Sequence, residues 1–150
     1  MALLYSTGFR MGSLGSAANP TGNPIQDLLA SGIVKIYSGT APATADAAFA
    51  GTLLVAIDNG GSATTFAEPS SNAIAKTGAE TWSVAATATG TASYFRYVIK
   101  ATDDGTLSTS QVRIQGTVGT SGADMIIGNT AIVSGATQTI DTFTLTAHES

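Results

Sequence analysis

The sequence predicts an all-β protein, a β-sandwich or jelly roll of about eight or nine strands with one short N-terminal helix and an extended N-terminal arm. Short runs rich in β-branched and aromatic residues recur at intervals of about 8–15 residues. Turn signals built on Gly, Pro, Asn and Asp separate these runs. Helix signals are confined to one segment near the N-terminus. We therefore expect an arm over residues 1–22 and a single β-sandwich domain over residues 23–150.

The predicted arm mixes apolar side chains with Gly, Ser, Asn and Pro and shows no period of 2 or 3.6. This pattern favours an extended conformation. The segment is too apolar for a typical disordered tail. We expect its large side chains to dock on this domain or on a neighbour, and we predict that they anchor an interface: Leu3, Leu4, Tyr5 and Phe9.

The helix is predicted over residues 23–32. Asn23 is a suitable N-cap, and Pro24 fits the first helical position. Gln26 is placed to reach back as in a capping box, and Gly32 can provide a left-handed exit. These signals predict a turn and a half of helix lying on the core.

Strands are predicted at residues 33–38, 52–58, 64–67, 82–88, 92–101, 111–118, 125–127, 131–134 and 139–147. Asn59-Gly60-Gly61 and Asp103-Asp104-Gly105 are the clearest turn signals between them. Near the C-terminus, Ile140 has the opposite parity to Phe143 and Leu145. This predicts either a β-bulge near Asp141-Thr142 or an outward-pointing Ile140.

Alternation within the strands predicts faces that are half buried. In residues 111–115, Val112 and Ile114 are expected to face inward. The strand at 92–101 has one apolar face and one amphipathic face, the latter formed by Tyr94, Arg96, Val98 and Lys100. We interpret the amphipathic face as one that an assembly partner partly covers.

Composition points the same way. Charged residues make up 11% of the 150 residues, against about 25% in a typical soluble domain. Ala, Gly, Ser and Thr account for 80 residues. So little charge suggests a surface covered in part by other chains, since charge normally resists association. A neutral β-domain covered by Ser and Thr and standing alone is the other interpretation.

Charge and cysteine content exclude several classes of partner. The net charge of −4 and the lack of any Lys/Arg cluster argue against a nucleic-acid binder. The apolar runs are far shorter than the roughly 20 residues of a spanning helix, so no membrane partner is expected. With no cysteine there is no disulfide, thiolate nucleophile or cysteine-ligated metal.

Catalytic signals are weak throughout. The one histidine, His148, lies third from the C-terminus, and the loop at residues 119–123 lacks the nucleophile-elbow pattern. Most acidic residues fall in turns, where carboxylates satisfy backbone groups. A glycosidase pair or calcium at Asp103-Asp104 are the alternatives for these carboxylates. We predict a protein that is not an enzyme and that has no cofactor, catalytic residue or metal site.

Four aromatic residues lie in two consecutive predicted strands: Trp82, Tyr94, Phe95 and Tyr97. An exposed platform of this kind could stack on sugars or bases. Aromatic residues in strands are more often core or cross-strand pairs. We predict core positions for this group with Tyr94 as the exception, and we add Tyr94 to the interface residues.

Several stretches carry a family resemblance. They include Ile33-Val34-Lys35-Ile36-Tyr37-Ser38-Gly39-Thr40-Ala41-Pro42, Gly90-Thr91-Ala92-Ser93-Tyr94-Phe95-Arg96, Gly116-Thr117-Val118-Gly119-Thr120-Ser121-Gly122-Ala123-Asp124-Met125 and Ile140-Asp141-Thr142-Phe143-Thr144-Leu145-Thr146. This text resembles small virion proteins of tailed bacteriophages over residues 25–147. The matching stretches are structural and contain no catalytic motif, so no functional residue is transferred from the family to this chain. The arm at residues 1–22 lies outside the matching text.

The resemblance implies a virion structural protein, most of all a capsid decoration (cement) protein that binds and stabilises the assembled phage head. The expected partners are the phage major capsid protein and further copies of this chain in a dimer or trimer. The expected location is the capsid surface of the virion, after synthesis in the host cytoplasm. The alternative is a tail or fibre component, or a carbohydrate-binding module for attachment to a host surface.

Overall fold

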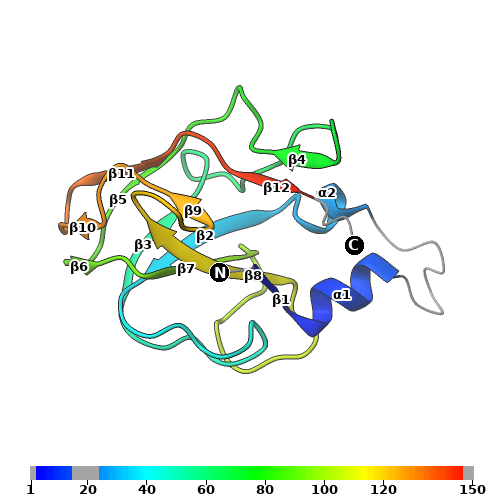
Figure 1. Cartoon of the computed structure of the whole chain (residues 1–150), viewed down its shortest axis with the longest axis horizontal. Helices are drawn as coiled ribbons and strands as arrows, with labels where there is room; N and C mark the ends of the chain where they lie inside the picture. Colours follow the sequence, from blue (N-terminus) through cyan, green and yellow to red (C-terminus); the bar gives the residue numbers. More distant parts are fainter. Residues whose placement is uncertain (1–2, 15–23, 147–150) are drawn as a thin grey trace.

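The computed structural model describes residues 3–14 and 24–146. These residues form mainly β-strands with few helices, which confirms the all-β prediction (Figure 1). Most strand pairs are antiparallel, as expected for strands joined by short turns. At the Asn59-Gly60-Gly61 signal the chain reverses tightly, and Asn59 and Ser62 exchange both backbone hydrogen bonds at 3.0 Å.

The larger sheet has the strand order β1-β8-β7-β2-β3. Its strands are β1 (Leu4–Tyr5), β8 (Arg113–Gly119), β7 (Tyr94–Ile99), β2 (Gly32–Tyr37) and β3 (Leu53–Ile57). A sixth strand, β9 (Met125–Ile126), pairs in parallel with the end of β8. Strands β2 and β7 lie inside the sheet, consistent with their β-branched and aromatic content.

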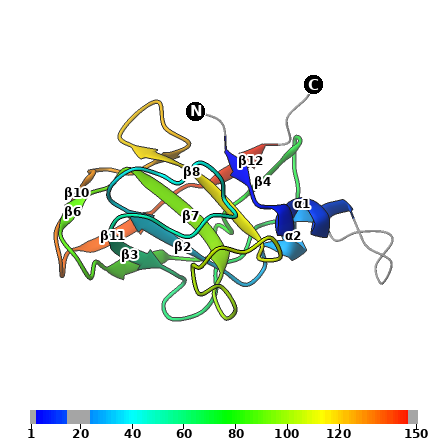
Figure 2. The same ribbon diagram turned by 90° about the horizontal axis from the view of Figure 1, so that it is seen from below.

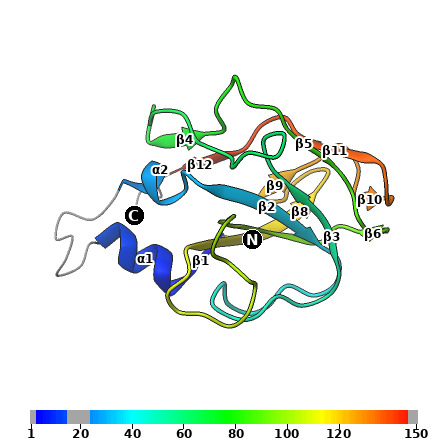
Figure 3. The same cartoon turned by 180° about the vertical axis from the view of Figure 1, so that it is seen from behind.

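A second layer is a long two-stranded ribbon built from three short pairs. Strands β4 (Ala73–Ala75), β5 (Trp82–Ala85) and β6 (Gly90–Thr91) pair in turn with β12 (Thr144–Thr146), β11 (Thr137–Ile140) and β10 (Ala131–Ile132). The ribbon arches over one face of the larger sheet (Figures 1 and 3). Backbone hydrogen bonds from Ser83 to Asp58 and from Thr87 to Leu54 attach it near β3.

The core fills the space between the sheet and the ribbon. Its aromatic side chains contact one another, with ring centroids 5.7 Å apart for Phe66 and Trp82 and 5.4 Å apart for Phe95 and Phe143. Trp82, Phe95 and Tyr97 are all fully buried here, so the predicted core positions are confirmed for them. Burial of rings this large is a major part of the stabilisation of a small domain.

Tyr94 is also buried, with 1% of its surface exposed, so its predicted exposure is wrong. Its ring stacks on Tyr37 with centroids 4.9 Å apart. Its hydroxyl donates to the carbonyl oxygen of Ala50 and accepts from the amide of the same residue. Both contacts lie on the face of the sheet opposite the ribbon.

That opposite face is covered by the chain's own loops, 38–52 and 100–112, which cross it in Figure 2. Arg113 and Gln115 are as buried there as Ile114 on the other side of the strand. The inward prediction for Ile114 is confirmed. The interpretation that an assembly partner covers the amphipathic face is wrong, because loop carbonyls occupy it.

Residues 7–14 form the helix α1 (Thr7–Leu14), so the predicted extended arm is wrong over this segment. This helix is not evident from the sequence, because the segment contains two glycines and its apolar residues do not recur with a helical period. Its contacts with the rest of the protein hold it in place. Residues 15–22 of the predicted arm lie outside the described residues.

The predicted helix at 23–32 reduces to α2 (Ile25–Leu28). Its N-cap is Pro24, and Gln26 donates to the carbonyl oxygen of Phe66 rather than to a capping box. The predicted cap, Asn23, lies outside the described residues. Gly32 already belongs to β2 and does not take the left-handed conformation that was predicted for it. A glycine is needed there for another reason, since a Cβ would overlap the ring of Tyr97.

Some strand details also differ from prediction. Residues 64–67 make only isolated bridges, and the unpredicted β4 follows a tight turn with positive φ at Ser71 and Asn72. Ile140 is buried, and the irregular residues between β11 and β12 absorb the change of parity. Of the two possibilities for Ile140, the structure selects the interruption of the strand near Asp141-Thr142.

Candidate functional site

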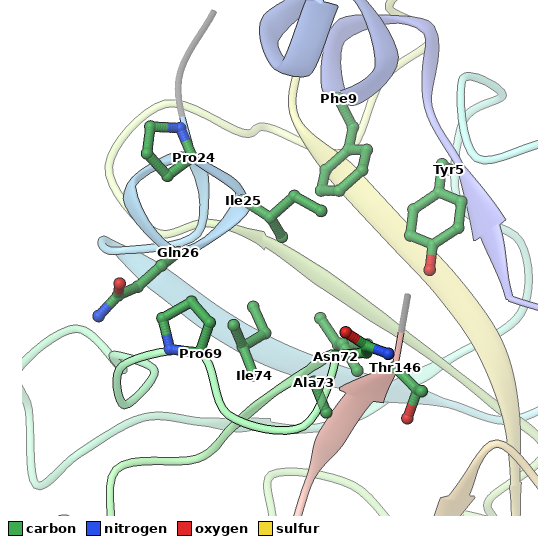
Figure 4. A pocket seen from close by; sticks show the side chains of 11 residues that line it. Tyr5, Phe9, Pro24, Ile25, Gln26, Pro69, Asn72, Ala73, Ile74 and Thr146 are labelled. Carbon is green, nitrogen blue, oxygen red and sulfur yellow. The ribbon is translucent and has the colours of Figure 1, made fainter. Parts of the chain in front are cut away.

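An apolar pocket of about 510 Å³ opens at the helical end of the molecule (Figure 4). Tyr5 and Phe9 form one wall, Ile25 of α2 forms the next, and the ends of β4 and β12 close the far side with Ile74 and Leu145. Phe9, Ile74 and Leu145 also belong to the hydrophobic core. The core is therefore incompletely sealed at this end, and a volume of this size is typical of ligand and anchor pockets.

Helix α1 is fixed to the body by its first residues. The Ser6 hydroxyl accepts from the amide of Phe9 at 3.1 Å, which is the N-cap contact that helix starts require. The same hydroxyl accepts from the amide of Arg113 and donates to the carbonyl oxygen of Gln111. Gly8 allows close approach, since a Cβ there would lie 2.3 Å from the Ser110 carbonyl oxygen. One small polar side chain and one glycine thus set the position of α1.

Asp46, from the loop between β2 and β3, completes this attachment. Its carboxylate accepts from the amide and the hydroxyl of Thr7 at 2.7 and 2.6 Å, at the positive end of α1. Burial alone would raise the pKa of Asp46, but the two hydrogen bonds from Thr7 outweigh it and lower that pKa. The carboxylate therefore stays ionised and holds the helix at neutral pH.

The outward side of α1 carries two large apolar residues beside the exposed Arg10. Met11 is 56% and Leu14 is 77% exposed, and Ile25 at the pocket mouth is 40% exposed. Isolated exposed apolar residues are ordinary, but several of them on two helices that also line an apolar pocket mark an interaction surface. We call these three residues together with the pocket the helical-end surface.

The structure brings together some of the predicted interface residues. Tyr5 and Phe9 stack with centroids 4.8 Å apart and line the pocket. Leu4 is partly exposed and lines a neighbouring pocket of about 280 Å³. Leu3 packs over Gly116, where a Cβ would meet its side chain at 2.7 Å. Tyr94 lies on the loop-covered face of the sheet, which Leu4 shares through its pairing with Gln115, so it is separated from the pocket residues Tyr5 and Phe9.

The expected docking of the arm on its own domain is confirmed for Phe9, which is buried. A role for these residues in contacts with another chain stays a prediction. Sequence reasoning missed Ile25, Ile74 and Leu145 as pocket residues. Only the Ser6-Thr7 dipeptide, a typical helix start, hinted that the arm would turn back and form a wall.

The charged cluster on the loop-covered face has a structural task. Arg113 makes a two-point ion pair with Asp103, at 2.5 and 2.9 Å, and both side chains are fully buried. It also donates to the carbonyl oxygen of Thr106, while Arg96 donates to that of Ala47 and to Gln115 Oε1. Burial raises the pKa of Tyr37 on this face to about 12. The hydrogen-bonding groups of these arginines are therefore occupied in fixing the loops to the sheet.

Other acidic residues in turns satisfy backbone amides, as their places predicted. Asp58 accepts from Gly61 and pairs with Lys100 at 2.7 Å, and Asp104 accepts from Thr106. In the part of the chain that the structure describes, no three His, Asp or Glu side chains are grouped to hold a metal. His148 lies outside that part.

Comparison of the chain with protein-family models, with curated proteins and with solved structures gave no match. Within residues 3–14 and 24–146, no helix has the length and apolar character needed to cross a membrane. The helical-end surface is therefore the site from which a function is inferred.

Proposed function

We propose that this chain is a structural protein of a tailed-phage virion, and in particular a capsid decoration protein that binds the assembled head. One observation carries the proposal: a helix pinned by buried contacts presents exposed Met11 and Leu14 on its outer side, while its Phe9 lines an open apolar pocket. A rigid element with large exposed apolar side chains is suited to docking. The resemblance of the sequence to phage virion proteins supplies the class of partner.

In this proposal the larger sheet and the ribbon are the two layers of a jelly-roll-like sandwich that serves as a rigid mount. Copies of the chain, as dimers or trimers, sit across the boundaries between capsid subunits. A protein that binds only the assembled shell stabilises it by mass action. Standard interfaces bury about 1,600 Å² in total, so many copies can reinforce a shell without any single strong contact.

The contacts described above weigh against a sugar-binding module. Such a module needs an exposed aromatic ring beside polar groups. The candidate rings Trp82, Tyr94, Phe95 and Tyr97 are all buried. Phe49 is partly exposed, but it is stacked on Tyr37 and lies over Gly105.

The first test is the copy number of this chain in purified particles, by quantitative peptide mass spectrometry against the most abundant shell protein. A number comparable to that of the shell protein is expected. A small fraction would instead assign the chain to the tail or fibre, and absence from particles would overturn the structural role.

The second test uses point variants, because deleting residues 2–22 would also remove the buried Ser6 and Phe9. The double variant Met11→Ser/Leu14→Ser changes exposed side chains and should leave the fold intact. We expect it to bind particles that lack the protein at least about tenfold more weakly than the original chain. Leu107→Ser, at a residue that is 73% exposed on another loop, is the matched control.

A further inference from the structure

The pocket lies where two sheet edges end. In the described residues β1 pairs only with β8, and β12 pairs only with β4. Tyr5 of β1 and Thr146 of β12 both line the pocket, from opposite sides in Figure 4. Edge strands carry unpaired backbone amides and carbonyls, which an extended chain can satisfy by strand addition.

The lining of the pocket carries no charged side chain. Two carboxylates are near this lining. Glu68 accepts from the side-chain amide of Gln26, a lining residue, at 3.4 Å, and the exposed Asp27 is the next residue on α2.

The cation nearest in sequence points elsewhere. Arg10 follows Phe9 on α1, but its guanidinium donates to the Thr7 hydroxyl and acts on Asp46. An occupant of the pocket therefore meets an uncharged interior and two nearby carboxylates. Such a site favours apolar side chains flanked by positive charge.

We propose that the pocket receives an extended segment of the shell protein, with one or two large apolar side chains flanked by Lys or Arg and its backbone paired to an edge strand. This inference rests on the proposed function and names the kind of partner segment that the helical-end surface holds. The apolar side chains fill the space beside Phe9 and Ile25, and the basic flank faces Asp27 and Glu68.

Two other occupants fit less well. A hydrocarbon chain would fill the interior but would leave the edge-strand amides and carbonyls without partners. A second copy docked on the same surface would bring Asp27 and Glu68 against their own equivalents, because a twofold contact places the same patch on both sides. Like charges at short range oppose such a contact.

The test uses the full chain and two labelled peptides, Lys-Val-Leu-Val-Leu-Lys and Glu-Val-Leu-Val-Leu-Glu, followed by fluorescence anisotropy. We expect the basic peptide to bind with a Kd below about 1 mM and the acidic peptide at least about tenfold more weakly. Added salt should reduce this difference, because it screens the two carboxylates. Dodecanol is the hydrocarbon probe and should compete poorly.

Variants locate the binding. Ile25→Lys removes an apolar wall and adds a repelling charge, so it should reduce binding of the basic peptide at least about tenfold. Val133→Lys makes the same kind of change at a residue that is 56% exposed near β10, and should leave binding unchanged. Glu68→Gln should weaken binding of the basic peptide more than Asp104→Asn does.

Equal binding of the two peptides, no binding at about 1 mM, or full binding by Ile25→Lys would each overturn the inference. Stronger binding of dodecanol than of the basic peptide would assign the pocket to a lipid instead. Binding to purified particles distinguishes a failure of the pocket inference from a failure of the proposed function. If they retain both the original chain and Ile25→Lys, only the pocket inference fails; if they never retain the original chain, the structural role itself fails.

Discussion

The loop-covered face of the larger sheet and the helical end of the core show opposite relations between polarity and exposure. The loop-covered face of the larger sheet is rich in charge, with Arg96, Arg113 and Asp103, yet it is closed to solvent. The helical end is apolar, with Phe9, Ile74 and Leu145, yet it opens into a pocket. A charged strand face here indicates internal fastening, and an apolar end indicates a surface still available to a partner.

The reason lies in the loops. Residues 38–52 and 100–112 contain no regular structure that would pair their carbonyl groups, and buried carbonyls need donors. A guanidinium offers five N–H donors in a fixed fork, so Arg96 and Arg113 can satisfy several carbonyls each. At the helical end fewer polar groups are needed, since a serine, a glycine and one carboxylate attach the whole of α1.

Breaking the buried ion pair should have the largest effect. Asp103→Ala leaves Arg113 charged and without its carboxylate, which costs about 3–5 kcal/mol in buried pairs. We expect the free energy of unfolding to fall by this amount in urea titrations. A loss below about 1 kcal/mol would mean that loop carbonyls alone hold the arginine. The contrast between the loop-covered face and the helical end would then weaken.

Crowding the helix contact comes next. Gly8→Ala places a Cβ against backbone oxygens of residues 110 and 111, and overpacking of this kind costs about 1–3 kcal/mol. Gly12→Ala is the matched control in the same helix, because its new methyl group meets only the movable end of Leu28. Equal unfolding free energies for the two variants would show that α1 is not held by close packing at Gly8.

Removing the cap should have a smaller effect. Ser6→Ala loses the acceptor for the amides of Phe9 and Arg113, and we expect about 1–2 kcal/mol of destabilisation. Hydrogen exchange at the Phe9 amide should accelerate more than exchange in β7. Ser13→Ala, which loses only an exposed bond to Arg10, is the control and should change neither.

The smallest effect should be that of acid. Because the pKa of Asp46 is lowered from its usual 3.8, its contribution to stability is complete above about pH 4 and is lost as the pH falls through the lowered value. Acid should therefore loosen α1 through Thr7. Asp46→Asn should remove this part of the pH dependence, measured as the exchange rate of the Thr7 amide; an unchanged profile would assign the effect to another carboxylate.

Much of the β-framework could be predicted from the sequence, because β-branched and aromatic runs such as those of β2 and β7 report directly on strands. The faces of the strands could not be fully predicted. Arg113 alternates with Ile114 as a solvent-facing residue would, and only the position of the two loops reveals that it is buried. Periodicity describes the strand itself and not what lies above it.

The helical-end surface was predictable only in part. Tyr5 and Phe9 were identified as anchors from their size and setting, and both line the pocket. Their partners Ile25 and Leu145 are 120 residues apart in sequence, so no local pattern could join them. Helix α1 was missed because its stability comes from tertiary contacts at Ser6 and Gly8 rather than from helix propensity.

The Ser6 hydroxyl also sets an order of events during folding. Its partners Gln111 and Arg113 lie 105 and 107 residues further along the chain. On the ribosome, α1 therefore has no place to settle until most of the protein has been synthesised. Contacts that close such large loops are slow to form, so the N-terminal segment should join the body late. The helical-end surface is then completed only on a chain whose β8 is already in place, which couples its appearance to the near-complete fold.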